Sequence, residues 1–173
     1  GCALSRKANT FVDVLGAGGY RTASIGKSHL QPFTGKEPVG QEKDTFERLI
    51  PEAWKSEGKP YLSEEPSSFK DAEETEFETP YYGFQHVDMV TGHGYDCGGH
   101  YGQWFRKTYP NWKDLHDRKN ELPHNYSCPQ AFRTAVPEEA YPTTWIGDRA
   151  VNYINESASH DEPFFAFVSF PDP

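Results

Sequence analysis

Apolar residues recur at helical spacing close to the start of the chain. The three apolar positions are Phe11, Val14 and Leu15. Thr10 can cap the first turn, and Asp13 stands three residues later, where the acidic partner of a capping box belongs. Gly18-Gly19 ends the pattern, because glycine adopts the left-handed conformation of a helix C-terminus at little cost. The spacing therefore predicts a helix that opens over Thr10–Leu15.

The residues that follow this helix predict a short strand. Residues 21–25 alternate weakly and include the β-branched side chains of Thr22 and Ile25. Lys27 and His29 come next, two residues apart, so an extended chain points both side chains to the same face. A strand that delivers lysine and histidine at its carboxyl end is how an open α/β sheet builds an anion site. The local pattern alone also fits two solvated residues at a strand end.

A second helix-and-strand pattern lies near the end of the sequence. It begins at Pro142, and four apolar residues then fall on one helical face: Ile146, Ala150, Val151 and Ile154. Residues 156–163 form a polar connection, and residues 164–170 are an apolar run that predicts a buried strand. We expect two αβ units, residues 8–33 and 143–173, with their strands parallel.

Between these units, residues 34–142 lose regular periodicity, and prolines, glycines and aromatic residues dominate. Short helices are expected near residues 45–54 and 102–109. Loops this long in an α/β protein usually lie over the carboxyl ends of strands and shape the pocket. The densest group of possible ligands lies in residues 92–100 and comprises His93, Asp96, Cys97 and His100. These residue types could hold a transition metal, but their spacing fits no known metal motif, and the glycines suit a tight pocket-lining loop equally well.

The composition excludes some classes of function. The chain of 173 residues carries a net charge of −9, which argues against binding to nucleic acid, because phosphates attract a basic surface. Only 35% of residues are apolar, and no apolar run approaches the ~20 residues that a membrane helix needs. Acidic residues gather in 64–65 and 71–78, where we expect a solvated loop or helix face.

One local motif imitates a phosphate-binding P-loop. Gly26-Lys27-Ser28 matches the end of that motif, but Arg21 stands where the motif requires its first glycine. The motif also needs a helix that starts at the lysine, and Pro32 would end such a helix almost at once. We therefore expect no P-loop.

Residues 19–30, Gly-Tyr-Arg-Thr-Ala-Ser-Ile-Gly-Lys-Ser-His-Leu, closely resemble the second signature of the sulfatase family, in the alkaline phosphatase superfamily. Residues 163–173 are similar to the family's strand that runs into a Pro-His pair. Residues 80–84, 98–101 and 143–149 resemble a subgroup of bacterial sulfatase-like hydrolases. The resemblance implies an α/β fold with an alkaline-phosphatase-like sheet and flanking helices. This chain would be a partial domain of that fold with a long irregular insertion.

The resemblance also implies roles for particular residues. Lys27 would contact the sulfate oxygens, and His29 would support the hydroxyl of the nucleophile. His100, in the 98–101 segment, is a further candidate for substrate binding. The chemistry agrees, because a lysine and an imidazole already in position stabilise the charge that grows on sulfate oxygens in the transition state. An imidazole can also relay a proton near neutral pH.

Other parts of the implied chemistry have no counterpart in the sequence. The family's nucleophile is a formylglycine made from the first residue of a Cys/Ser-x-Pro/Ala-x-Arg motif, and its metal is Ca²⁺. Residues 2–6 imitate this motif, but Leu4 replaces the proline. We therefore expect the formylglycine upstream of Gly1 and the calcium ligands mostly outside the chain. Residues 1–173 would then be an inactive fragment of one catalytic domain.

The expected activity of the parent protein is hydrolysis of a sulfate monoester, carried by a small molecule or a carbohydrate. Two rivals remain open: a phosphonate or phosphate ester hydrolase of the same superfamily, and a non-catalytic scaffold that keeps the fold. No nucleic-acid or membrane partner is expected. We expect a soluble protein, and the sequence leaves bacterial cytoplasm and periplasm equally open.

Overall fold

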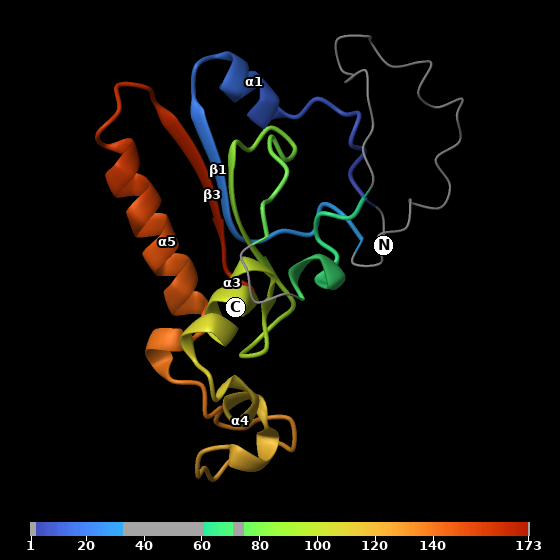
Figure 1. The fold of residues 1–173 in the computed structure, drawn as a ribbon, viewed down its shortest axis with the longest axis vertical. Helices are drawn as coiled ribbons and strands as arrows, with labels where there is room; N and C mark the ends of the chain where they lie inside the picture. The colour runs from blue at the N-terminus through green and yellow to red at the C-terminus, as the bar shows by residue number, and fades with distance from the viewer. Residues whose placement is uncertain (1–2, 33–60, 71–74, 173) are drawn as a thin grey trace.

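The computed structural model describes residues 3–32, 61–70 and 75–172. These residues form a mixed α/β structure in which helices flank a small parallel sheet (Figure 1). The expected helix near residues 45–54 lies outside the described residues. No helix in the described part of the chain is long and apolar enough to cross a membrane.

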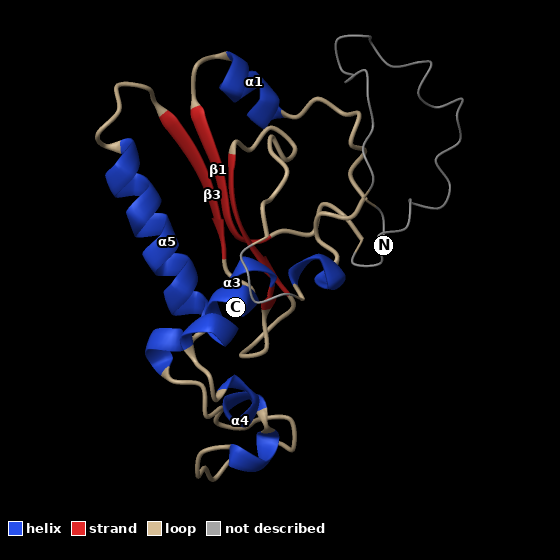
Figure 2. Cartoon of the chain, in the orientation of Figure 1, coloured by secondary structure: helices blue, strands red, loops and turns tan. Residues whose placement is uncertain are grey.

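The described sheet has three strands in the order β2-β1-β3, and both pairs are parallel. The strands are β1 (Arg21–Lys27), β2 (His86–Thr91) and β3 (Phe164–Ser169). In register, Lys27 is paired with Val90 of β2, and Gly26 is paired with Ser169 of β3. Figure 2 shows the three strands running side by side, away from α1. The two predicted strands, β1 and β3, and their parallel arrangement are therefore confirmed. β2 was not predicted, because it lies within residues 34–142, which the sequence pattern indicated to be irregular.

The first helix, α1 (Phe11–Ala17), begins as its sequence predicts. The Thr10 hydroxyl accepts a hydrogen bond from the Asp13 backbone N–H at 3.2 Å, and the Asp13 carboxylate accepts from the Thr10 N–H at 2.8 Å. This reciprocal capping box satisfies two backbone donors that the first turn of a helix leaves open. The Thr10 hydroxyl also donates to the Tyr82 carbonyl at 2.8 Å, which ties the helix start to the turn before β2.

The long helix α5 (Pro142–Ser157) is confirmed, but the face that it buries differs from the predicted one. Ile146 is buried as expected, whereas Val151 and Ile154 are 56% and 46% exposed. Tyr153 is buried instead, because its ring packs edge-on against Phe164 with centroids 5.9 Å apart. The helix therefore turns an aromatic side chain toward the sheet and leaves two aliphatic ones outside.

The prediction that the last strand is buried is wrong. β3 lies at the edge of the described sheet, and Phe164 and Phe167 are 39% and 46% exposed. An apolar run fixes the strand conformation, but burial also requires covering elements on both faces. The helix α5 contacts both β1 and β3, so it covers only part of β3.

Two apolar cores lie on the sheet. The first joins the sheet to α5 and to α3 (Gly99–Thr108), and it includes Ala23, Ile25, Val90, Tyr101, Phe105 and Ile146. The second joins the sheet to α1 and includes Val12, Tyr81, Tyr82, Phe84 and Met89. The short helix α4 (Trp112–His116) and the 3-10 turns η2 (Pro66–Phe69), η3 (Arg118–Asn120) and η4 (Glu138–Ala140) complete the described elements. The helix expected at 102–109 is confirmed as α3, which begins three residues earlier.

Candidate anion-binding site at the carboxyl edge of the sheet

The carboxyl ends of the three parallel strands bring three separate segments together. Lys27 is the last residue of β1, His93 follows β2, and Pro171 follows β3. The Lys27 ammonium lies 2.5 Å from His93 Nε2 and 3.2 Å from His93 Nδ1. The Nδ1 atom in turn lies 3.1 Å from the Pro171 carbonyl oxygen. Open α/β sheets bind their ligands at this edge, so the Lys27–His93 contact marks the candidate site.

The turn that carries His93 is fixed on both sides. Gly92 and Gly94 adopt φ values of +83° and +62°, the left-handed region that glycine enters without strain. The Gly94 N–H donates to Asp172 Oδ1 at 2.9 Å, and the Cys97 thiol donates to the Gly94 carbonyl at 3.1 Å. These contacts hold the exposed His93 ring beside Lys27.

Three groups that can lose a proton lie near this turn: the Asp172 carboxyl, the Tyr141 hydroxyl and the Cys97 thiol. Tyr141 donates its hydroxyl hydrogen to Asp172 Oδ2 at 3.1 Å. Burial, together with this hydrogen bond, raises the pKa of Tyr141 to about 12, and burial also raises the pKa of Cys97 to about 12. Tyr141 and Cys97 therefore stay protonated near neutral pH. The Asp172 carboxylate is held by a backbone N–H on one oxygen and a phenol on the other.

Gly26 sets the end of β1. Its φ is +106°, and a Cβ atom at this position would lie 2.0 Å from the backbone oxygen of Ser169. Only glycine fits between the two strands here, so this residue serves strand packing. Residues 28–32, which follow Lys27 directly, form no helix.

Lys27 and His29 line the same cavity, as the two-residue spacing predicts. The cavity has a volume of about 490 Å³. Its wall is largely apolar and includes Phe11, Tyr82, Phe84 and Phe167. Lys27 is half-buried, and His29 is exposed. The two candidate residues therefore border one cavity, with apolar side chains beside them.

A buried carboxylate anchors the loop that carries His29. Glu64 is fully buried, and its Oε1 accepts hydrogen bonds from the Ser28 hydroxyl at 2.9 Å and from the Leu30 N–H at 2.9 Å. The same oxygen accepts from the Gln31 N–H at 3.2 Å and from the Tyr81 hydroxyl. The expectation of a solvated acidic segment is therefore wrong for Glu64. It holds for Glu76 and Glu78, which are exposed, and residues 71–74 lie outside the described part.

The structure places His100 away from Lys27 and His29. His100 is buried in α3, where its Nδ1 accepts from the Met89 N–H and its Nε2 lies 3.1 Å from the Thr75 carbonyl oxygen. Both ring nitrogens thus have backbone partners, and the ring lines a different cavity of about 430 Å³. The expected substrate-binding histidine supports the packing of α3 on β2 instead.

The other candidate ligands in residues 92–100 do not converge. Asp96 lies 3.2 Å from His116, and Cys97 points to the Gly94 carbonyl. In the described ranges, no three His, Cys, Asp or Glu side chains are placed to hold a metal ion. The calcium that the family resemblance implies therefore has no fitting ligand set among these residues.

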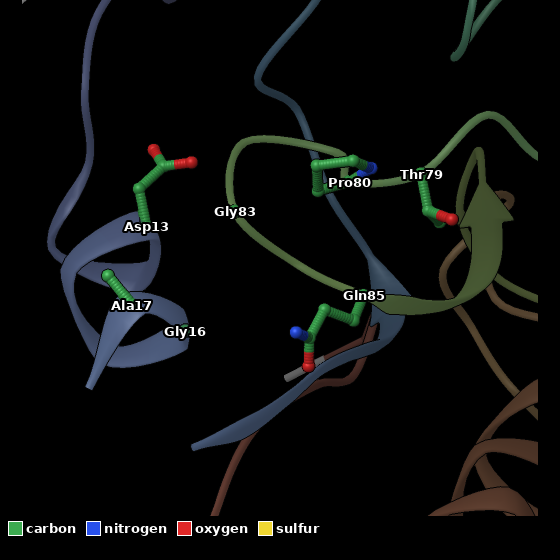
Figure 3. Close-up of a pocket in the computed structure, with 7 residues that line it drawn as sticks. All are labelled: Asp13, Gly16, Ala17, Thr79, Pro80, Gly83 and Gln85. Carbon is green, nitrogen blue, oxygen red and sulfur yellow. The ribbon is translucent and has the colours of Figure 1, made fainter. Parts of the chain in front are cut away.

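A smaller cavity of about 310 Å³ lies at the opposite, amino edge of the sheet (Figure 3). Its lining residues are Asp13, Gly16, Ala17, Thr79, Pro80, Gly83 and Gln85. The polar groups here serve the fold: Asp13 caps α1, and the Gln85 side-chain oxygen accepts from the Thr22 N–H at 3.2 Å. The candidate site therefore remains at the carboxyl edge.

Comparisons of the chain with protein-family models, with curated proteins and with solved structures found no match. The class of protein that the structure itself defines is a mixed α/β chain with a parallel sheet and a lysine–histidine contact at its carboxyl edge.

Sequence reasoning identified Lys27 and His29 but gave His93 no special place among the possible ligands. The sequence held one part of the signal, since His93 stands between two glycines, but the strand before it, β2, was not predicted. Glu64 carried no such signal, since its neighbour Glu65 makes the pair look like an ordinary acidic surface.

Proposed function

We propose that this chain forms part of a sulfuric ester hydrolase with an alkaline-phosphatase-like fold, in which Lys27 and His29 bind the sulfate group. The observation that carries the proposal is the position of the Lys27 ammonium. It stands at the carboxyl end of the central strand, in one cavity with His29. The sulfatase-like sequence of residues 19–30 supports the assignment.

Sulfate ester cleavage requires stabilisation of negative charge and transfer of a proton. A sulfate ester carries a fixed negative charge, and its cleavage moves further charge onto oxygen. The Lys27 ammonium can stabilise that charge with little reorganisation, because Lys27 is the last residue of β1 and the strand fixes its backbone. His29 lies on the cavity wall, where it supports the attacking group and relays a proton.

The proposal assigns the remaining catalytic groups to residues outside the described ranges. The formylglycine nucleophile and the Ca²⁺ ion belong to this remainder. When bound, the ion would supply positive charge to the sulfate oxygens. What the described residues supply is the lysine, the histidine and the rigid loops that hold them.

Steady-state kinetics on an aryl sulfate, measured with the intact parent protein that contains this chain, test the proposal. Lys27→Ala should lower kcat by about a hundredfold or more, the usual effect of losing one well-placed donor. It should change KM much less, because the charge that Lys27 meets grows in the transition state. Lys27→Arg should rescue little, since a planar guanidinium does not occupy the place of a compact ammonium. Lys107→Ala, an exposed lysine of α3, is the matched control and should keep normal turnover.

Three outcomes would overturn the proposal. Near-normal turnover of Lys27→Ala with an unchanged thermal melt would make Lys27 a solvated strand end. Faster turnover of the matching aryl phosphate would assign the site to phosphate esters. An absence of turnover with both esters in the native protein would favour a non-catalytic scaffold.

A further inference from the structure

The partners of His93 indicate which of its ring nitrogens carries the hydrogen. The Pro171 carbonyl can only accept, so the Nδ1 atom, 3.1 Å away, carries a proton and donates it. The Lys27 ammonium can only donate, so the Nε2 atom accepts from it. This pairing assigns the hydrogen of the neutral imidazole to Nδ1. In this state its Nε2 lone pair occupies one donor of Lys27.

A neutral acceptor is the wrong partner for an anion at Lys27. An oxyanion that approaches the ammonium would meet the lone pair of Nε2 and be repelled by it. Uptake of one proton at Nε2 changes the group into a donor and adds a positive charge. The Nδ1–H bond to the Pro171 carbonyl can persist, since both ring nitrogens of an imidazolium donate. The ring therefore has no need to leave its turn.

We propose that His93 is a second anion-binding residue of the Lys27 site, and that it takes up one proton when a sulfate or sulfate-ester group binds there. The inference rests on the proposed function in so far as it requires an oxyanion at Lys27. The proton comes from solvent, the Lys27-to-Nε2 hydrogen bond breaks, and the freed Lys27 N–H and the new Nε2–H both face the anion.

The construction of the turn supports this role. His93 is exposed, yet the residues on either side of it are glycines in the left-handed region. The backbone after it is tied to Asp172 by the Gly94 N–H and to Cys97 by the Gly94 carbonyl. An exposed side chain with no binding role does not need two such ties on the backbone next to it. These contacts hold the His93 imidazole next to the Lys27 ammonium.

The charged groups around His93 fit a proton-linked donor. Asp172, after β3, supplies negative charge next to the turn and favours a protonated ring. Lys27, on β1, opposes protonation until an anion offsets its charge. Tyr141 and Cys97 keep their protons, and Asp96 is engaged with His116. His93 contacts the Lys27 ammonium directly, whereas His29 lines the cavity that Lys27 borders, so the test must separate the two imidazoles.

Binding of inorganic sulfate to the full chain tests the inference. Isothermal titration at constant ionic strength should give an affinity that rises as the pH falls from 8 to 6. The rise should approach tenfold per pH unit, the limit for one linked proton. Repeating the titration in two buffers with different ionisation enthalpies should show uptake of about one proton per sulfate.

Three single variants assign the proton. His93→Gln can still accept from Lys27 and donate to the Pro171 carbonyl, but it cannot gain a proton, so its sulfate affinity should be independent of pH. His29→Gln should bind sulfate more weakly at every pH and keep the pH dependence. His160→Gln, an exposed histidine between α5 and β3, is the matched control and should behave as the unaltered chain.

A spectroscopic readout covers the case in which His93→Gln fails to fold. Nitrogen chemical shifts of the His93 ring in the unaltered chain should show the Nδ1–H form without sulfate and the imidazolium with sulfate. A ring that stays neutral at saturating sulfate overturns the inference, and so does a pH dependence that survives in His93→Gln. If sulfate binds through Lys27 in these experiments, the proposed function stands. If the unaltered chain binds no sulfate, or binds it equally well as Lys27→Ala, both proposals fail together.

Discussion

At the scale of single residues, Glu64 shows how strongly one buried acid can organise a functional loop. It receives four hydrogen bonds on one oxygen, and three of them come from Ser28, Leu30 and Gln31, on either side of His29. The fourth comes from the Tyr81 hydroxyl. Its other oxygen is buried without a partner, as is the side-chain nitrogen of Gln31. A buried polar group without a partner costs free energy. We therefore expect the four hydrogen bonds that Glu64 does receive to contribute to the stability of the fold.

We expect Glu64→Ala to lower the free energy of unfolding by about 3 kcal/mol or more, because each buried donor left without a partner costs about 1–3 kcal/mol. Glu64→Gln keeps one oxygen as an acceptor and should cost about 1–2 kcal/mol. The neighbouring Glu65→Ala is the control and should stay within about 0.5 kcal/mol of the unaltered chain. Urea denaturation at pH 7 measures all three. Equal effects at positions 64 and 65 would contradict the anchoring role of Glu64.

At the scale of elements, β1 is the centre of the candidate site because it pairs on both edges. It is bonded to β2 along residues 23–27 and to β3 along residues 21–26. Gly26 lies in both pairings, and its positive φ brings the Ser169 carbonyl closer than any side chain would permit. The end of the strand, and with it Lys27, therefore depends on one glycine.

A matched pair of substitutions tests this dependence. Gly26→Ala should lower the free energy of unfolding by at least about 2 kcal/mol, because left-handed strain adds to a clash with backbone. Gly147→Ala, inside α5 with open space around it, should raise stability by up to about 1 kcal/mol. Thermal and urea unfolding of both variants gives the comparison. A neutral Gly26→Ala would mean that β1 and β3 approach less closely than the structure shows.

At the scale of the whole molecule, both apolar cores bury weak acids in their protonated forms. Cys97 and Tyr101 lie in the core with α3 and α5, and Tyr81 lies in the core with α1. Burial raises the pKa of each group, and the nearby Glu64 carboxylate raises that of Tyr81 further. A raised pKa in the folded state means that unfolding releases protons at alkaline pH. Stability is therefore complete below the ordinary pKa of these groups and is lost as the pH rises above it.

The free energy of unfolding should accordingly fall above about pH 9, by up to about 1.4 kcal/mol per pH unit for each buried acid that ionises on unfolding. Cys97→Ala should flatten the decline that begins near pH 9, because the pKa of Cys97 is raised to about 12 in the folded chain. Cys128→Ala removes an exposed thiol and should leave the slope unchanged. Urea midpoints under reducing conditions from pH 7 to 10.5 check this. A slope that is the same in all three proteins would show that Cys97 is not shielded from solvent.

The sequence by itself determined the local elements of this protein. The capping box of Thr10 and Asp13, the strand at residues 21–27 and the helix after Pro142 depend on neighbours a few residues away. Such short-range interactions are visible in a one-dimensional pattern. The parallel arrangement of β1 and β3 also followed, because each strand directly follows a helix, and repeated αβ units of one sheet run in the same direction.

Only the tertiary structure decided which side chains meet and which are buried. Lys27 and His93 are separated by 66 residues, and Glu64 lies 36 residues from Ser28, so no local period could pair them. The buried face of α5 likewise follows from the sheet beneath it, where Tyr153 finds the Phe164 ring. Periodicity predicts that a residue belongs to a helix or strand. Contact partners, which come from distant segments, decide whether its charge is solvated, buried or opposed by another charge.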